Sequence, residues 1–199
     1  NFTGANSSIS SVGGNVNFNQ AASPGQITVT GGPTNGVITA NAGAGNVLFN
    51  GGANAVQVNV RRIDGCIGGS GNPFNITVGD TTGTTAIGNL NLPGDIVVNS
   101  ANDIVICGPL TSAANVSLTS GTAHSITQNT GATVSALLNV GYTTNVLNLN
   151  SSTSSTSGTI NIQGNGAGNA LTVNFQQPGS NSSLTALTGG FGTDNIIFN

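Results

Sequence analysis

Short clusters of apolar residues recur along the chain at intervals of about ten residues, and Gly, Asn, Asp and Ser fill the gaps between them. All six prolines lie in these gaps, where a missing N–H removes no hydrogen bond from a strand. Short strands separated by turns are therefore expected along the whole chain. The clusters are VNFNQ (16–20), ITVT (27–30), VITA (37–40), VLFN (47–50), VQVNV (56–60), NITV (75–78), TAIGNLNL (85–92), IVVN (96–99), IVIC (104–107), VSLT (116–119), SIT (125–127), TVSALLNV (133–140), VLNLN (146–150), TINIQ (159–163), ALTVNF (170–175) and IIFN (196–199).

Strands at this spacing are typical of a sandwich, a barrel or a solenoid, and the brevity of the clusters favours a solenoid. Related phrases also recur without a strict period, as in GNVNFN (14–19), GNVLFN (45–50) and DNIIFN (194–199). Small polar residues at the corners suit stacked turns in which neighbouring rungs share one core. We therefore expect one all-β solenoid domain over 1–199, a segment of a longer repetitive chain. The alternative is an antiparallel β-sandwich of pilin type, which strict alternation over seven or more residues would support. Only VQVNV (56–60), NLNLP (89–93) and the segment 133–140 come close to such alternation.

Charge is scarce: only 4% of residues are charged, against about 25% in average proteins. The net charge is −3, and Lys, Glu, Met and Trp are absent. A nucleic-acid partner is excluded because almost nothing could neutralise phosphates. A membrane span is not expected, since no apolar run approaches the roughly 20 residues required. The charged residues are Asp64, Asp80, Asp95, Asp103, Asp194, Arg61 and Arg62.

One stretch resembles a known family. The run DIVVNSANDIVICGPLTSAANVSLTSGTAHSITQNTGATVSA (95–136) is similar to the repeats of filamentous-haemagglutinin-type adhesins. Those repeats read as a short strand, an apolar-Gly-Pro-Leu turn, a Val-Ser-Leu-Thr strand and a Ser-Ile-Thr-Gln strand. The resemblance implies a right-handed parallel β-helix that is secreted or displayed on the cell surface. It brings no catalytic residues with it.

The titratable residues argue against an enzyme. Carbohydrate-active enzymes on β-helices gather several acids with Lys or Arg on one face, whereas Asp95 and Asp103 each open a separate short strand. We expect both aspartates to cap their own turns. His124 has no Cys, Asp or Glu near it in the sequence, which predicts neither a metal site nor a Ser-His-Asp arrangement. No catalytic residue is predicted.

The segment GGFGTDNII (189–197) fits the nonapeptide of calcium-binding β-rolls, in which Asp194 would supply a ligand oxygen. Those sites are completed by a stacked second copy, and the chain contains one copy. The interpretation is a structural turn, with a calcium site at Asp194 as the alternative. No other cofactor is predicted.

Cys66 and Cys107 predict one disulfide, as in secreted proteins. The stretch 65–74 is the longest glycine-rich interruption of the apolar pattern, so the bridge is expected to attach this loop to the coil. Cysteines on adjacent rungs lie close enough to bridge, whereas cysteines two rungs apart require a loop that reaches across.

Two further groups of residues have structural interpretations. Arg61, Arg62 and Asp64 predict a local ion pair at a strand exit, with docking to a partner subunit as the alternative. Four phenylalanines at matching places in the repeated phrases are expected to fill the core rather than form a binding platform. They are Phe18, Phe49, Phe175 and Phe198.

Together these features predict an extracellular structural and adhesive protein, a rigid rod segment of a surface adhesin. The alternative is a subunit of an extracellular filament that stacks head-to-tail, suggested by the uncharged cluster IIFN (196–199). A carbohydrate-active enzyme on a β-helix is the third and weakest hypothesis. The expected partners are copies of the chain or its own continuation, together with glycans or proteins of a host or other surface.

Overall fold

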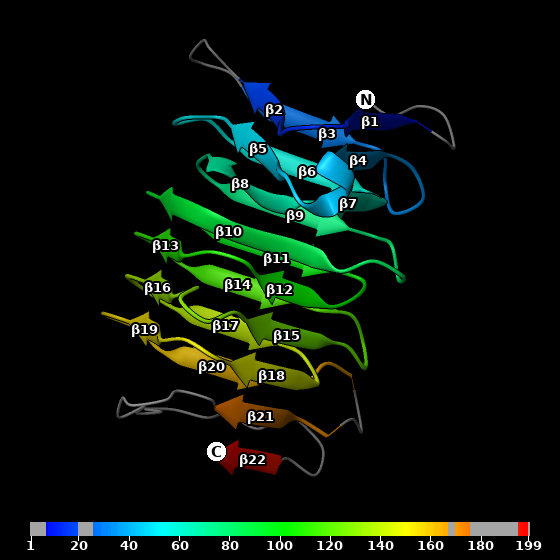
Figure 1. Cartoon of the computed structure of the whole chain (residues 1–199). Coiled ribbons are helices and arrows are strands. Elements are labelled where there is room, and N and C mark those ends of the chain that lie inside the picture. The colour runs from blue at the N-terminus through cyan, green and yellow to red at the C-terminus, as the bar shows by residue number, and fades with distance from the viewer. Residues whose placement is uncertain (1–6, 20–25, 167–169, 176–194, 199) are drawn as a thin grey trace.

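The computed structural model describes residues 7–19, 26–166, 170–175 and 195–198. It is a parallel β-solenoid in which short strands stack along one axis (Figure 1). One 3-10 turn, η1 (Asn41–Gly43), interrupts the strands of the described part. The strands are β1 (Ser8–Ser11), β2 (Val16–Asn19), β3 (Ile27–Thr30), β4 (Val37–Ala40), β5 (Asn46–Asn50), β6 (Val56–Val60), β7 (Arg62–Asp64), β8 (Cys66–Ser70), β9 (Phe74–Val78), β10 (Thr85–Leu92), β11 (Ile96–Ser100), β12 (Ile104–Ile106), β13 (Leu110–Ser112), β14 (Val116–Thr119), β15 (Ser125–Gln128), β16 (Val134–Ala136), β17 (Val140–Thr143), β18 (Val146–Leu149), β19 (Thr153–Ser155), β20 (Ile160–Gln163), β21 (Thr172–Phe175) and β22 (Asn195–Phe198).

The strands form three sheets, which we call A, B and C. Sheet A holds β1, β4 and β7 in that order, and sheet C runs β20-β17-β14-β11-β9-β6-β3. Sheet B has twelve strands; its long strand β10 pairs with β8 on one side and with both β12 and β13 on the other. Every pairing among the described strands is parallel, so the solenoid is confirmed and the antiparallel sandwich is wrong.

The core is a set of apolar columns that run along the solenoid axis. In sheet C, Val56, Phe74, Ile96, Val116 and Val140 are in register with one another, and all five are buried. Because side chains alternate between the two faces of a strand, the same register leaves a second set of columns pointing outward. Each rung thus shares its apolar face with its neighbours, as the short clusters predicted.

Two of the four matched phenylalanines show their role directly. Phe49 is fully buried, and Phe18 stacks on it with ring centroids 4.9 Å apart. Phe74 meets Phe49 edge-on at 6.5 Å. These contacts confirm core filling at this end of the core. The side chains of Phe175 and Phe198 lie outside the description, although β21 and β22 bring their backbones into register.

The strand positions within 95–136 agree with the short strands expected there from the sequence. The Val-Ser-Leu-Thr segment is β14, and the Ser-Ile-Thr-Gln segment is β15. The Gly-Pro-Leu turn leads into β13, which continues the stack begun by β10. The short apolar clusters of the sequence therefore mark the strands of this region.

Two segments differ from the sequence prediction. The glycine-rich stretch 65–74 is not a simple interruption, because β8 occupies Cys66–Ser70. A Cβ atom at Gly69 would collide with the backbone of Phe49, so glycine permits a close approach of two strands there. The run 133–140 is not one alternating strand: it divides into β16 and β17, and Leu137 and Leu138 are exposed at the corner between them.

Candidate functional site

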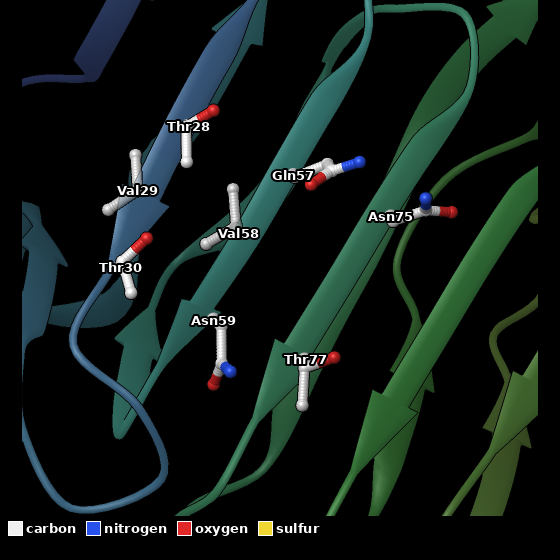
Figure 2. Close-up of a pocket in the computed structure, with 8 residues that line it drawn as sticks. All are labelled: Thr28, Val29, Thr30, Gln57, Val58, Asn59, Asn75 and Thr77. Atoms are coloured by element: carbon white, nitrogen blue, oxygen red, sulfur yellow. The ribbon is translucent and has the colours of Figure 1, made fainter.

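A groove of about 400 Å³ lies on the outer face of sheet C (Figure 2). It crosses β3, β6 and β9, each of which contributes two outward side chains. Val29 and Val58 also line it, but their side chains are buried in the core, so the strand backbone forms the floor. The outward side chains are Thr28, Thr30, Gln57, Asn59, Asn75 and Thr77.

The groove follows from the register of sheet C. Thr28, Gln57 and Asn75 form one outward column, and the residues two positions further along each strand form the other. Rungs lie about 4.8 Å apart, and alternate residues on one strand about 7 Å apart. The groove wall is therefore a grid of three strands by two positions, made of hydroxyl and carboxamide groups without a charged side chain.

Elsewhere, outward polar side chains bind one another along the axis. The clearest example is the row Asp95, Asn115, Asn139 and Thr159, which we call the Asp95 ladder; each member directly precedes a strand of sheet C. Asn115 donates its Nδ2–H and its backbone N–H to Asp95 Oδ1 at 2.9 and 3.1 Å. Asn139 does the same to Asn115 Oδ1 at 3.0 and 3.1 Å, and Thr159 donates its backbone N–H to Asn139 Oδ1 at 3.0 Å.

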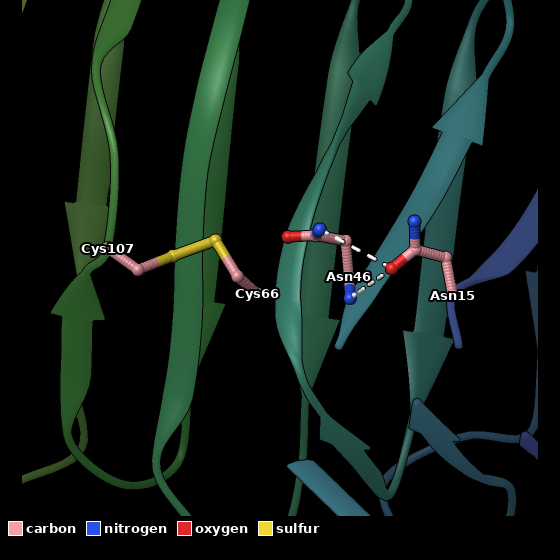
Figure 3. Close-up of a disulfide and its surroundings, with 4 residues drawn as sticks. All are labelled: Asn15, Asn46, Cys66 and Cys107. Atoms are coloured by element: carbon pink, nitrogen blue, oxygen red, sulfur yellow. Dashed lines mark hydrogen bonds between the residues drawn. A yellow bond between two sulfur atoms is a disulfide. The ribbon is translucent and has the colours of Figure 1, made fainter. Parts of the chain in front are cut away.

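Sheet B carries ladders of the same kind. Asn46 donates its backbone N–H to Asn15 Oδ1 at 2.9 Å (Figure 3). On the opposite side of β10, Asn174 Nδ2 donates to Asn148 Oδ1 at 2.7 Å, and Asn148 Nδ2 donates to Thr127 Oγ1 at 3.0 Å. Side-chain ladders thus add hydrogen bonds along the axis to those of the strand backbone.

The two candidate acids of the sequence analysis do not cap their own turns, which corrects that prediction. Asp95 binds the following rung through the Asp95 ladder, and Asp103 does so through Ser125. Ser125 donates its backbone N–H and its hydroxyl to Asp103 Oδ1 at 2.6 and 2.8 Å. Asp80, in contrast, closes its own turn, because it accepts hydrogen bonds from the N–H and hydroxyl of Thr82 at 3.0 and 2.7 Å.

His124 has an acidic neighbour that the sequence did not reveal, because the solenoid places it one rung away. Its Nδ1 lies 3.5 Å from Asp103 Oδ1. Burial raises the pKa of the Asp103 carboxyl, but the two hydrogen bonds from Ser125 and the proximity of His124 outweigh it and lower the pKa overall. Ser125 and His124 both approach Asp103, so the serine hydroxyl donates to the carboxylate rather than to the imidazole.

The arginine cluster forms the predicted local ion pair. Arg62 Nη2 lies 3.0 Å from Asp64 Oδ2, an oxygen that also accepts a hydrogen bond from Thr39 at 2.9 Å. Arg62 Nη1 lies 4.0 Å from Asp80 Oδ2. The Thr82 hydrogen bonds, assisted by the charges of Arg61 and Arg62, lower the pKa of Asp80 despite its burial. The cluster ties β7 to the loop before β10.

A buried polar network that the sequence analysis missed lies inside the later rungs. The Tyr142 hydroxyl is 2.9 Å from Thr153 Oγ1, which donates to Gln128 Oε1 at 3.3 Å. Gln128 Nε2 donates to the carbonyls of Ala132 and Ser152 at 2.6 and 2.9 Å. Burial raises the pKa of Tyr142, partly offset by the bond to Thr153. These partners satisfy polar groups whose isolated burial would be costly.

Cys66 and Cys107 form a disulfide with their Cα atoms 6.4 Å apart (Figure 3). Cys66 is the first residue of β8 rather than part of a loop, and Cys107 follows β12. Strand β10 lies between β8 and β12, and Cys107 lies in the turn between β12 and β13. The bridge therefore crosses a rung from a turn residue, in agreement with the expectation that such a bridge needs a loop that reaches across. The residue of β10 in register with Cys66 is Ala86, whose small side chain suits the crossing.

No group of three or more His, Cys, Asp or Glu side chains that could hold a metal occurs in residues 7–19, 26–166, 170–175 and 195–198. The calcium candidate Asp194 lies outside those residues. The same part of the chain contains no helix with the length and apolar character needed to cross a bilayer.

The fold and these contacts define the class: a parallel β-solenoid with axial side-chain ladders and one disulfide across a rung. The chain matches no protein-family model, no curated protein and no solved structure.

Proposed function

We propose that the chain is a rigid, non-catalytic rod segment of an extracellular surface adhesin. The observation that supports this most strongly is the unbroken parallel stack of sheet C, from β3 to β20. Its strands lie across the axis, so backbone hydrogen bonds point along the axis from rung to rung. A rod of this kind holds its ends at a fixed separation and displays its outer faces.

Three further features support rigidity. The apolar columns form one continuous cluster, so bending the rod would open packed core. The Asp95 ladder adds side-chain hydrogen bonds to the same axial direction. The disulfide joins β8 to the turn after β12, on either side of β10.

The extracellular and adhesive parts of the proposal rest on other observations. A disulfide is typical of oxidising compartments. The resemblance of 95–136 to filamentous-haemagglutinin-type repeats favours a secreted or cell-surface adhesin, and the strands observed there follow the repeat pattern. A non-catalytic role fits the engagement of Asp64, Asp80, Asp95 and Asp103 in separate structural contacts.

Rigidity can be measured as a distance distribution between two spin labels on sheet C. Labels introduced through unnatural amino acids at Asn59 and Gln163 leave the disulfide intact. The register places these residues in one column, five strand spacings apart, so their backbones are about 24 Å apart. A narrow distribution near that value, broadened by the label linkers alone, is the expected result. A distribution as broad as that of the chain unfolded in denaturant would refute the rod.

Adhesion is tested separately with beads that carry the purified chain, under flow over cultured epithelial cells. Beads coated with albumin provide the reference, and beads coated with chain that was reduced and unfolded control for non-specific contact. Retention above both references is expected. Retention equal to the albumin reference would refute the adhesive part and leave the rod measurement unaffected.

The purified chain also distinguishes the proposal from the two alternative functions predicted from the sequence, a filament subunit and a carbohydrate-active enzyme. Head-to-tail stacking into a filament predicts growing fibres in electron micrographs as the concentration rises, whereas a rod segment predicts dispersed particles. Release of oligosaccharide products from a glycan panel would overturn the non-catalytic proposal.

A further inference from the structure

We propose that the groove across β3, β6 and β9 binds a neutral oligosaccharide. This rests on the proposed adhesive function and names the ligand class for one of its contact surfaces. The groove is a defined concavity of about 400 Å³, within the range of about 300–1,000 Å³ typical of ligand sites. Its six outward side chains provide three hydroxyl and three carboxamide groups in two columns across three strands (Figure 2).

The hydrogen-bonding capacity of these six side chains is unused. Within the part of the chain that the structure describes, no side-chain hydrogen bond engages any of them, although Gln57 faces Asn75, and Asn59 faces Thr77, across neighbouring strands. This differs from the Asp95 ladder, where side chains of the same chemistry at comparable spacing bind one another. The groove therefore retains donors and acceptors for a ligand, while the ladder does not.

The chemistry of the lining selects the ligand class. A hydroxyl or a carboxamide both donates and accepts hydrogen bonds, as do the hydroxyl groups of a sugar. A charged ligand would lose hydration without gaining a counter-charge, because the lining contains no ionisable side chain. Arg61 and Arg62 follow the end of β6 but do not line the groove, and Arg62 pairs with Asp64 and lies 4.0 Å from Asp80.

Two other occupants fit less well. An apolar peptide would find no large apolar side chain presented by the lining, since Val29 and Val58 are buried. An ice surface requires a regular array, whereas successive rungs present Thr with Thr, Gln with Asn, and Asn with Thr. Side chains of three lengths form a contoured wall, which suits a short oligosaccharide.

The test is a titration followed by nuclear magnetic resonance. The whole chain is produced in bacteria, so that the glycosylation sequon Asn75-Ile76-Thr77 carries no glycan. The probes are neutral hexose tetrasaccharides of several linkages, together with sulfated and sialylated tetrasaccharides as the charged set. Neutral probes are expected to shift the side-chain amide signals of Gln57, Asn59 and Asn75 in a saturable way. The amide signals of the Asp95 ladder should stay in place.

Paired variants then locate the site. Gln57→Ala removes one carboxamide from the groove, and Gln163→Ala makes the same change on β20, on the same face but outside the groove. Loss of one neutral hydrogen bond corresponds to affinity weaker by about three- to tenfold. We expect that loss for Gln57→Ala and unchanged affinity for Gln163→Ala. Asn59→Ala against Asn99→Ala on β11 provides a second pair.

The proposal would be overturned if no neutral probe binds, if only charged probes bind, or if both members of each variant pair lose affinity equally. Thermal hysteresis, a freezing temperature below the melting temperature, without any glycan binding would indicate that this face binds ice. That result would also overturn the proposal. None of these results bears on the spin-label distance. Failure of the groove and failure of the rod are therefore distinguishable.

Discussion

Replacing Asn115 by aspartate changes one atom of the Asp95 ladder from a donor to an acceptor. In the native chain, Asn115 Nδ2 donates to Asp95 Oδ1 at 2.9 Å, and Asn115 Oδ1 accepts two hydrogen bonds from Asn139. In Asn115→Asp the bonds from Asn139 persist, but a carboxylate oxygen now faces the Asp95 carboxylate. The variant keeps its size and strand position, so the hydrogen-bond donor and the charge are what change.

The cost has two parts, a missing hydrogen bond and a new repulsion between charges. A hydrogen bond to a charged acceptor contributes about 1.5–3 kcal/mol. Repulsion between the two carboxylates adds about 1 kcal/mol at 4 Å in water, and the stronger bonds from Asn139 recover part of the loss. We expect a net decrease of about 2–3 kcal/mol in the free energy of unfolding. Asn139→Asp is the matched control, because it loses one neutral bond to Asn115 and creates no acid pair, a cost of about 1 kcal/mol.

The assay is urea and thermal denaturation of both variants, followed by far-ultraviolet circular dichroism. The expected difference in the free energy of unfolding between the two variants, about 1–2 kcal/mol, corresponds to a difference in Tm of about 2–8 °C for a chain of this size. Two carboxylates in contact bind a proton more readily in the folded chain than when separated by unfolding. The difference in stability between the two variants is therefore present at neutral pH and becomes smaller as the pH falls. The double variant Asp95→Asn/Asn115→Asp has no carboxylate pair, so it should regain at neutral pH the stability that Asn115→Asp loses to charge repulsion.

Two results would refute this reasoning. One is an Asn115→Asp variant as stable as Asn139→Asp at neutral pH, which would show that the ladder contributes nothing specific. The other is a stability gap that does not change with pH, which would show that the loss arises from packing rather than from the carboxylate pair.

Three more outcomes are expected. Replacing both Cys66 and Cys107 by Ser should lower stability by about 4 kcal/mol, the chain-entropy value for a sequence separation of 41, measured by urea denaturation against the oxidised chain. Gly88→Ala should destabilise the chain by more than about 2 kcal/mol, because the new Cβ atom would collide with the backbone of the next rung. Gly141→Ala is the control and should be neutral or stabilising, because the nearest atom to its new Cβ lies at 3.9 Å. Equal melting temperatures of the two variants would contradict this expectation. Asp103→Asn should lose less stability in acid than the native chain does. The folded-state pKa of Asp103 is lowered, so its stabilisation is present at neutral pH and is lost as the pH falls through that pKa. Urea midpoints measured between about pH 6 and pH 2 would show the difference.

The sequence by itself determined the strands and the direction of their apolar faces. ITVT (27–30), VITA (37–40) and VSLT (116–119) coincide with β3, β4 and β14, because a buried column needs an apolar residue at alternate positions of every rung. The short clusters and recurring phrases were enough to predict a solenoid. They failed at β8, where glycine replaces the apolar signal to let two strands approach, and at Leu137 and Leu138, whose apolar character did not mean burial.

Only the tertiary structure decided which residues meet. Asp95 and Asn115 are 20 positions apart, as are Asn139 and Thr159, whereas Asn115 and Asn139 are 24 apart. Because rungs differ in length, no fixed period in the sequence could align the ladder, bring His124 to Asp103 or place Cys66 across β10 from Cys107. The groove has the same origin. Its six side chains come from three rungs, and their free hydrogen-bonding capacity is set by strand register, which an individual cluster does not encode.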